Sequence, residues 1–74
     1  MLTFELSKDR DELNIFGDAE GLQELSLFID KVINSKDHEH LMTPSWAGHE
    51  LSEEQQDSVG FLLHKVTIRY AGQR

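Results

Sequence analysis

Apolar and polar residues alternate in two short stretches near the N-terminus. Every second residue from Leu2 to Leu6 is apolar, and a period of two is typical of a strand with one buried face. After the polar sequence KDRDE the alternation resumes and places Leu13 and Ile15 on the buried side. The pattern predicts an antiparallel hairpin at the start of the fold.

The period changes between residues 17 and 35, where we expect an amphipathic helix. Asp18 is the expected N-cap because its carboxylate can accept a hydrogen bond from the first turn, and Glu20 adds favourable negative charge there. Gly17 allows a sharp turn from strand to helix. Apolar residues then recur at spacings of three and four, which describes one helical stripe: Leu22, Leu25, Phe28, Ile29, Val32 and Ile33.

Two further extended segments complete the predicted fold. Residues 39–42 (EHLM) form one strand, and residues 61–70 (FLLHKVTIRY) form the longest. The loop between them carries turn formers, an acidic run and a short strand over residues 49–51. The order β-β-α-β-(β)-β predicts one α+β domain over residues 1–74, with one helix on one face of a small, mainly antiparallel sheet. The opposite face would be left to solvent or a partner.

Composition narrows the classes of function. With no cysteine among 74 residues, disulfides, thiolate zinc sites and cysteine nucleophiles are excluded, which fits a reducing compartment. The N-terminus lacks the pattern of a signal peptide, and no apolar run approaches the ~20 residues that span a bilayer. We therefore expect a cytoplasmic protein that does not contact membrane. A net charge of −7 disfavours nucleic acid and favours basic partners.

The segment DHEHLMTPSWAGHEL, residues 37–51, concentrates three of the four histidines. On a strand His38 and His40 point to the same side, as two metal ligands would. The other candidates, among them His49, lie at no recognisable metal spacing, so we expect neither a metal nor a cofactor. A metal-dependent regulator or enzyme using these three histidines remains the alternative. His64 lies in the apolar register of the last strand and is expected at the edge of the core.

Catalysis is not expected. The serines lack a nucleophile-elbow pattern, no Gly-rich phosphate loop is present, and a domain of 8.5 kDa has little room for a pocket of ~300 Å³. Trp46 lies in a predicted loop, where it either covers the end of the core or anchors an interface.

Three motifs in order, GDAEGLQEL, DHEHLMTPSWAGHELS and HKVTIRY, resemble the immunity protein 32 family of bacterial polymorphic toxin systems. The resemblance runs from about Leu13 to Tyr70 and departs at Ala47-Gly48, where the family pattern has two glycines. It implies a small cytoplasmic α+β protein that binds and neutralises a cognate toxin without catalysis. The acidic charge would suit a basic toxin such as a nuclease. A generic protein-interaction module is the other alternative.

Two contact surfaces are expected. The toxin would be bound by the histidines, the tryptophan and the acidic loop, that is by His38, His40, Trp46, His49, Glu50, Glu53, Glu54 and Asp57. A homodimer is expected through the uncovered sheet face or a strand edge, because Phe61 and Leu63 lie on the face of the last strand opposite the core and Phe16 is available nearby.

Overall fold

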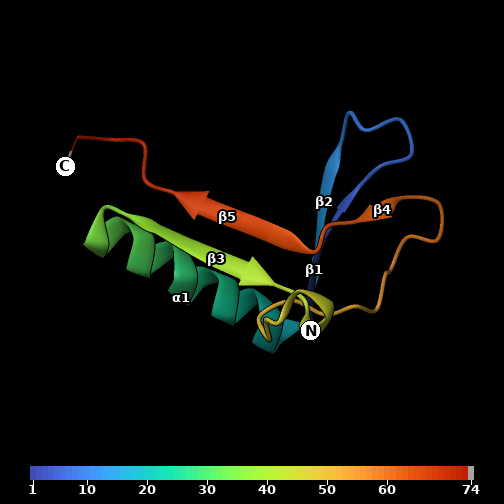
Figure 1. The fold of residues 1–74 in the computed structure, drawn as a ribbon, viewed down its shortest axis with the longest axis horizontal. Coiled ribbons are helices and arrows are strands. Elements are labelled where there is room, and N and C mark those ends of the chain that lie inside the picture. The colour runs from blue at the N-terminus through green and yellow to red at the C-terminus, as the bar shows by residue number, and fades with distance from the viewer. Residues whose placement is uncertain (74) are drawn as a thin grey trace.

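The computed structural model describes residues 1–73 and contains one α-helix and five strands (Figure 1). All strand pairs are antiparallel. The predicted α+β fold, with a hairpin followed by one helix, is confirmed. In chain order the elements are β1 (Leu2–Leu6), β2 (Leu13–Gly17), α1 (Ala19–Ser35), β3 (His38–Met42), the 3-10 turn η1 (Pro44–Trp46), β4 (Phe61–Leu62) and β5 (Lys65–Arg69).

The strands form two sheets rather than the one that the sequence pattern predicts. One sheet has the order β2-β1-β4, and β3 pairs with β5 in the other. The single strand predicted over residues 61–70 is therefore wrong. The Leu63 N–H donates to the Phe4 carbonyl of β1 at 2.9 Å. The carbonyl of the next residue, His64, instead accepts from the Thr43 N–H, just after β3, at 3.0 Å. The chain thus passes from β1 to β3 within two residues, at the junction of β4 and β5 in Figure 1.

The short strand expected over residues 49–51 is not formed. This segment instead makes single backbone hydrogen bonds to each sheet: the Leu51 N–H donates to the Met42 carbonyl at 3.2 Å, and the Ser52 N–H donates to the Leu2 carbonyl at 2.8 Å. The Leu51 side chain is buried. The segment therefore joins the two sheets without extending either of them.

Asp18 caps α1 as predicted. Its Oδ1 accepts from the Gly21 N–H at 2.8 Å and from the N-terminal ammonium of Met1 at 2.8 Å. The hydrogen bond from that ammonium, followed by the one from Gly21, lowers the pKa of the Asp18 carboxyl. A Cβ on Gly21 would lie 1.9 Å from the Met1 carbonyl oxygen, so the close approach of α1 to the start of β1 requires glycine. The cap therefore also joins the helix to the first strand.

Asp18→Ala should lower the thermal unfolding midpoint more than Asp18→Asn does. Asn keeps a cap acceptor for the first turn, although it loses the charge that binds the Met1 ammonium. Circular dichroism melts of the two variants at neutral pH would compare them. Equal losses would assign the effect to the ion pair with Met1 and not to capping.

The helix buries a narrower stripe than predicted. Val32 is buried, and Leu25 and Phe28 are half-buried toward the sheets. Two strands spaced by ~4.8 Å cover little more than the width of one helix. α1 lies along β3 and β5 (Figure 1), and one flank of its predicted stripe stays exposed: Leu22, Ile29 and Ile33.

The core lies where the helix, both sheets and the 49–52 segment meet. It is small, as a chain of this length requires. Its buried cluster is Leu2, Phe4, Leu41 and Leu51, with Leu25, Phe28, Leu63, Val66 and Ile68 packed against it.

The inner face of the β2-β1-β4 sheet is less covered at β2 than predicted. Leu13 and Ile15 share a face with Leu2 but remain about half exposed, because the helix passes only over the Gly17 end of β2. A Cβ on Gly17 would lie 2.9 Å from the Leu22 side chain, which shows that the helix covers this end of β2. The prediction that both residues are buried is therefore wrong, although the side to which they point is correct.

The opposite face of this sheet is buried by the acidic loop, where solvent or a partner was expected. Glu5 is 1% exposed, and its carboxylate accepts from Thr3 Oγ1 at 2.6 Å and from the backbone N–H groups of Gln56 and Asp57 at 2.9 Å each. These hydrogen bonds lower the pKa of Glu5 even though burial alone would raise it. The loop is thus fastened across the back of β1.

Candidate interaction surface

The register of β3 with β5 brings the two predicted histidines together with two cations. Glu39 and Leu41 pair with Ile68 and Val66 on the face toward the helix. Paired residues of an antiparallel ladder share a face, so the alternate pairs lie on the outer face: His38 with Arg69, His40 with Thr67, and Met42 with Lys65. The sequence pattern placed Lys65, Thr67 and Arg69 on one face but could not join them to the histidines.

His38 and His40 lie close together on this outer face. Their ring centroids are 4.7 Å apart at an interplanar angle of 68°, His38 Nδ1 lies 2.8 Å from Asp37 Oδ1, and His40 Nδ1 lies 3.0 Å from Thr67 Oγ1. Desolvation, followed by electrostatic interaction with Lys65, His38 and Arg69, lowers the pKa of His40. The two cations of the outer face, Lys65 and Arg69, thus lie beside the histidines on an otherwise acidic protein.

A metal site is not supported by this pair. Within residues 1–73 no group of three or more His, Asp or Glu side chains is placed to hold a metal ion. His49 contacts Glu50 instead, with 3.3 Å between His49 Nδ1 and Glu50 Oε2. The three histidines of the metal-binding alternative are therefore not gathered.

Trp46 lies in η1, on a braced loop that follows β3. Its ring stacks on that of His64 with centroids 6.1 Å apart and planes 3° apart, yet 54% of the residue is exposed. His64 Nδ1 lies 2.7 Å from the Oγ1 of the buried Thr43, whose carbonyl accepts from the N–H groups of Trp46 and Gly48 at 2.9 and 3.0 Å. The indole is therefore held in position from behind while much of its surface faces solvent.

The Ala47-Gly48 step has a specific backbone requirement. Ala47 adopts φ 66° and ψ 21°, the left-handed conformation in which glycine is favoured. A Cβ on Gly48 would lie 2.5 Å from the Met42 carbonyl oxygen. The structure thus explains why the family pattern has glycine at both positions. This chain carries alanine only at position 47, where the side chain is strained but accommodated.

Ala47→Gly should stabilise the protein by about 0.5–1 kcal/mol, because the left-handed conformation is strained for alanine and free for glycine. Gly48→Ala is the matched control and should destabilise, since the new methyl group meets backbone. Urea denaturation measures both. A loss of stability in Ala47→Gly would show that unfolded-state entropy outweighs the strain.

Two acidic residues of the predicted contact set hold the loop in place. Glu50 Oε1 accepts from the Met42 N–H at 3.0 Å, and its side chain is only 16% exposed. Glu53 Oε1 accepts from the Ser45 N–H. The hydrogen bonds to Ser45 lower the pKa of Glu53, and that of Glu50 is lowered by backbone donors, chiefly Met42, against the opposing effect of burial. These carboxylates therefore fix the loop that presents Trp46.

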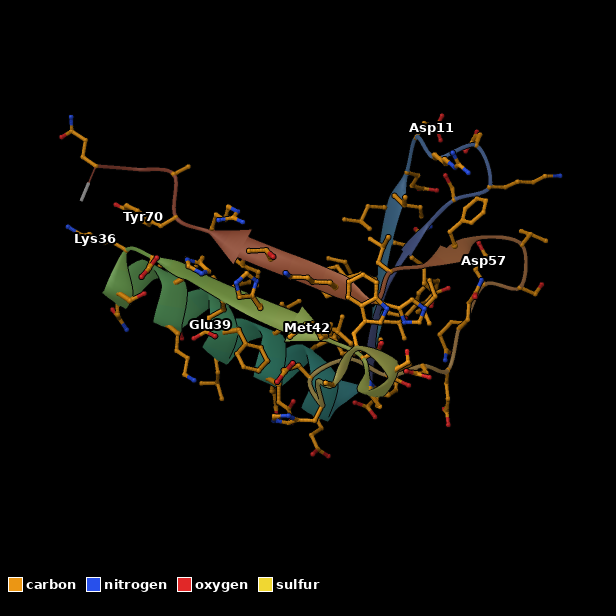
Figure 2. All side chains as sticks on the ribbon, in the orientation of Figure 1. Asp11, Lys36, Glu39, Met42, Asp57 and Tyr70 are labelled. Carbon is orange, nitrogen blue, oxygen red and sulfur yellow. The ribbon has the colours of Figure 1, made fainter. Side chains whose placement is uncertain are left out.

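The remaining predicted residues lie around the rest of the loop. His49 and Glu54 are exposed, whereas Asp57 is half-buried and accepts from the Val59 N–H at 3.1 Å. In Figure 2 Asp57 lies beside β4, well separated from Met42 at the end of β3. The predicted set is therefore spread over the outer face and the loop and does not form one compact patch.

A shallow depression lies between the start of α1 and the loop segment that carries His49 and Glu50. It has a volume of about 220 Å³ and is lined by Met1, the first turns of α1 and residues 49–52. Small-molecule sites are commonly ~300–1,000 Å³ and largely apolar. This depression is smaller, and its lining includes Glu20, Glu24 and Glu50.

The two residues expected at a dimer contact behave differently. Phe61 is 43% exposed, with the Arg10 guanidinium 4.8 Å from its ring centroid. Leu63 packs against the core, so its prediction as a surface residue is wrong. The reason is the switch between sheets, which turns Leu63 inward. Phe16, the third residue considered, is half-buried.

No helix in the part of the chain that the structure describes is long and apolar enough to span a bilayer. The molecule has a small α+β fold that exposes a sheet face with two histidines and a tryptophan on a braced loop. The family model for immunity protein 32 matches residues 12–66, and the chain belongs to that family, which confirms the resemblance seen in its motifs. No curated protein and no solved structure gives a significant match.

Proposed function

We propose that this chain is a non-catalytic immunity protein that neutralises a cognate toxin domain by binding it in the cytoplasm. The observation that carries the proposal is the match of the immunity protein 32 family model over residues 12–66. The whole chain, residues 1–74, acts as one domain. The excess of acidic residues supports a basic toxin, such as a nuclease, because opposite charges speed association and fix orientation.

The contact surface centres on Trp46. An exposed indole whose rotamer is fixed by stacking loses little entropy on binding and contributes a large apolar area. His38 and His40 on the outer face and His49 on the loop add polar contacts, and Glu54 adds negative charge. Three further residues of the surface, Glu50, Glu53 and Asp57, act chiefly by holding the loop.

Co-expression in a bacterial host tests this function. The probe is the C-terminal domain of the toxin encoded directly upstream of this gene, since immunity genes ordinarily follow their toxin genes. The wild-type chain should restore growth, and Trp46→Ala should lose at least tenfold in affinity for the purified toxin domain, in line with a loss of about 1.4 kcal/mol or more at a central aromatic contact.

Leu27→Ala is the matched control, because Leu27 is a large apolar residue of similar exposure on the helix, away from the loop. It should bind as wild type does. Failure of the wild-type chain to protect would contradict the proposed function. Full binding by folded Trp46→Ala would leave the function standing and remove Trp46 from the contact surface.

A further inference from the structure

The edge of β2 carries no protection against pairing. β2 is the outermost strand of its sheet, with β1 on one side and no strand on the other (Figure 1). Its sequence, LNIFG, contains no charged residue and no proline. Natural edge strands usually carry lysine, proline or a bulge that blocks association with another strand. This edge is therefore open to a further strand.

The hydrogen-bond alternation identifies which backbone groups are available. The Ser7 N–H donates to the Glu12 carbonyl, and the Asp18 N–H donates to the Met1 carbonyl. The pairs Ser7–Glu12 and Met1–Asp18, at the two ends of the β1–β2 ladder, are therefore hydrogen-bonded pairs. Antiparallel pairs alternate between bonded and non-bonded. The N–H and C=O groups of Leu13, Ile15 and Gly17 consequently point away from β1, and no other segment within residues 1–73 hydrogen-bonds to them.

An exposed apolar band adjoins this edge. It begins on the inner face of β2 and continues, past the contact of Leu22 with the Gly17 position, along the uncovered flank of α1. It consists of Leu13, Ile15, Leu22, Ile29 and Ile33, which are 51%, 46%, 47%, 42% and 55% exposed. The band thus contains as many large apolar residues as the protein buries in its core. An exposed apolar surface that is this large relative to the core marks an interface.

We propose that two copies of this chain form a symmetric dimer by antiparallel pairing of β2 with β2, centred on Ile15. Leu13, Ile15 and Gly17 all direct their hydrogen-bonding groups outward, so pairing Ile15 with its counterpart also pairs Leu13 with Gly17 of the second copy. Every outward donor and acceptor then finds a partner, as a two-fold axis allows. The result is one six-stranded sheet.

The side chains fit the same register. Leu22 of the helix covers the inner side of Gly17 and is itself 47% exposed. In the dimer Leu13 of the second copy lies opposite Gly17, on the face that Leu22 covers, and packs against Leu22. The same contact occurs twice about the two-fold axis, which favours a second copy over an unrelated strand, because each copy supplies both an exposed Leu13 and an exposed Leu22.

Charge sets the conditions under which the dimer forms. Each copy carries a net charge of −7, so long-range repulsion opposes association. The paired strands carry no charge, and Asp18, which comes opposite Glu12 of the second copy, is bound to the Met1 ammonium. Added salt screens the repulsion without weakening an apolar, backbone-bonded contact. The dimer should therefore strengthen as sodium chloride is raised.

Sedimentation equilibrium of the purified chain tests the proposal. At tens to hundreds of micromolar the mass should rise from 8.5 kDa toward twice that value, and more so in high salt. Ile15→Glu places two like charges against each other at the axis and should remain monomeric. Leu27→Glu makes a comparable charge change at a leucine 62% exposed outside the band and should dimerise as wild type does.

Two further variants test the backbone register. Because the Ile15 N–H points away from β1, Ile15→Pro removes no bond of the monomer and should give a folded monomer. Ile15→Cys introduces the sole cysteine. At a bonded antiparallel pair the Cα atoms lie about 5.5 Å apart, within the range that a disulfide spans. Mild oxidation should therefore cross-link Ile15→Cys but not Leu27→Cys.

A wild-type chain that stays at 8.5 kDa throughout this range overturns the proposal. Dimers that persist in Ile15→Glu and Ile15→Pro overturn it as well, because they would place the interface elsewhere. None of these measurements involves a toxin, so their outcome is independent of the proposed function.

Discussion

Leu41→Ala is expected to lower the free energy of unfolding by about 2–5 kcal/mol, the range for large-to-small changes in a packed core. Leu41 is 0% exposed and lies in the cluster where the helix meets both sheets. Native proteins have a total stability of only ~5–15 kcal/mol, so the variant should lose a large share of it. Urea denaturation followed by Trp46 fluorescence measures the change.

Ile29→Ala is the matched control for Leu41→Ala. Ile29 belongs to the apolar stripe predicted for the helix but is 42% exposed on the helix flank. Its removal should cost less than about 1.5 kcal/mol, because part of its surface already contacts water. Similar losses at Leu41 and Ile29 would contradict the helix orientation described above.

Glu5→Ala is expected to destabilise by about 2–4 kcal/mol. The substitution leaves the N–H groups of Gln56 and Asp57 and the hydroxyl of Thr3 without their acceptor in a buried site, and each such loss costs roughly 1–3 kcal/mol before relaxation. Glu5→Gln keeps one acceptor oxygen and should lose less. Thermal melts compare the variants, and hydrogen exchange at residues 56 and 57 shows whether the loop has detached.

The same carboxylate gives stability a defined pH dependence. The pKa of Glu5 in the folded protein lies below its ordinary value of 4.5, so around that pH the unfolded chain binds more protons than the folded one. Its contribution is therefore complete above pH 4.5 and is lost as the pH falls through the lower, folded-state pKa. Wild-type stability should fall more steeply there than that of Glu5→Gln. Parallel slopes would assign the acid sensitivity to other carboxylates.

Local patterns predicted the elements whose partners are close in the sequence. The hairpin and α1 follow from periods of two and of three to four residues, and the Asp18 cap follows from its position before the helix. The break at Leu63 and His64 has no such indication, because FLLHKVTIRY contains neither proline nor glycine. It arises when Leu63 bonds to Phe4 and His64 bonds to Thr43, and both partners are distant in sequence.

In the candidate site, too, residue types were predictable from the sequence, whereas contacts with distant backbone groups were not. Trp46, His38 and His40 are predicted as contact residues from residue type, and all three are exposed. The sequence did not indicate that Glu50 and Glu53 would be occupied by the N–H groups of Met42 and Ser45, because acidic residues in a polar loop look alike whether or not they bind backbone. Alternation likewise placed Glu5 toward solvent or a partner, although the loop covers it.

The crossing of the last segment between the two sheets determines the order in which the chain can fold. β4 pairs with β1 and β5 pairs with β3, so neither sheet is complete until residues 61–69 have been synthesised. Only the β1–β2 hairpin and α1 can form from local contacts, and the remaining pairings must close long loops, which slows folding. The apolar face of the hairpin therefore stays uncovered in a growing chain until the final segment is free to pair.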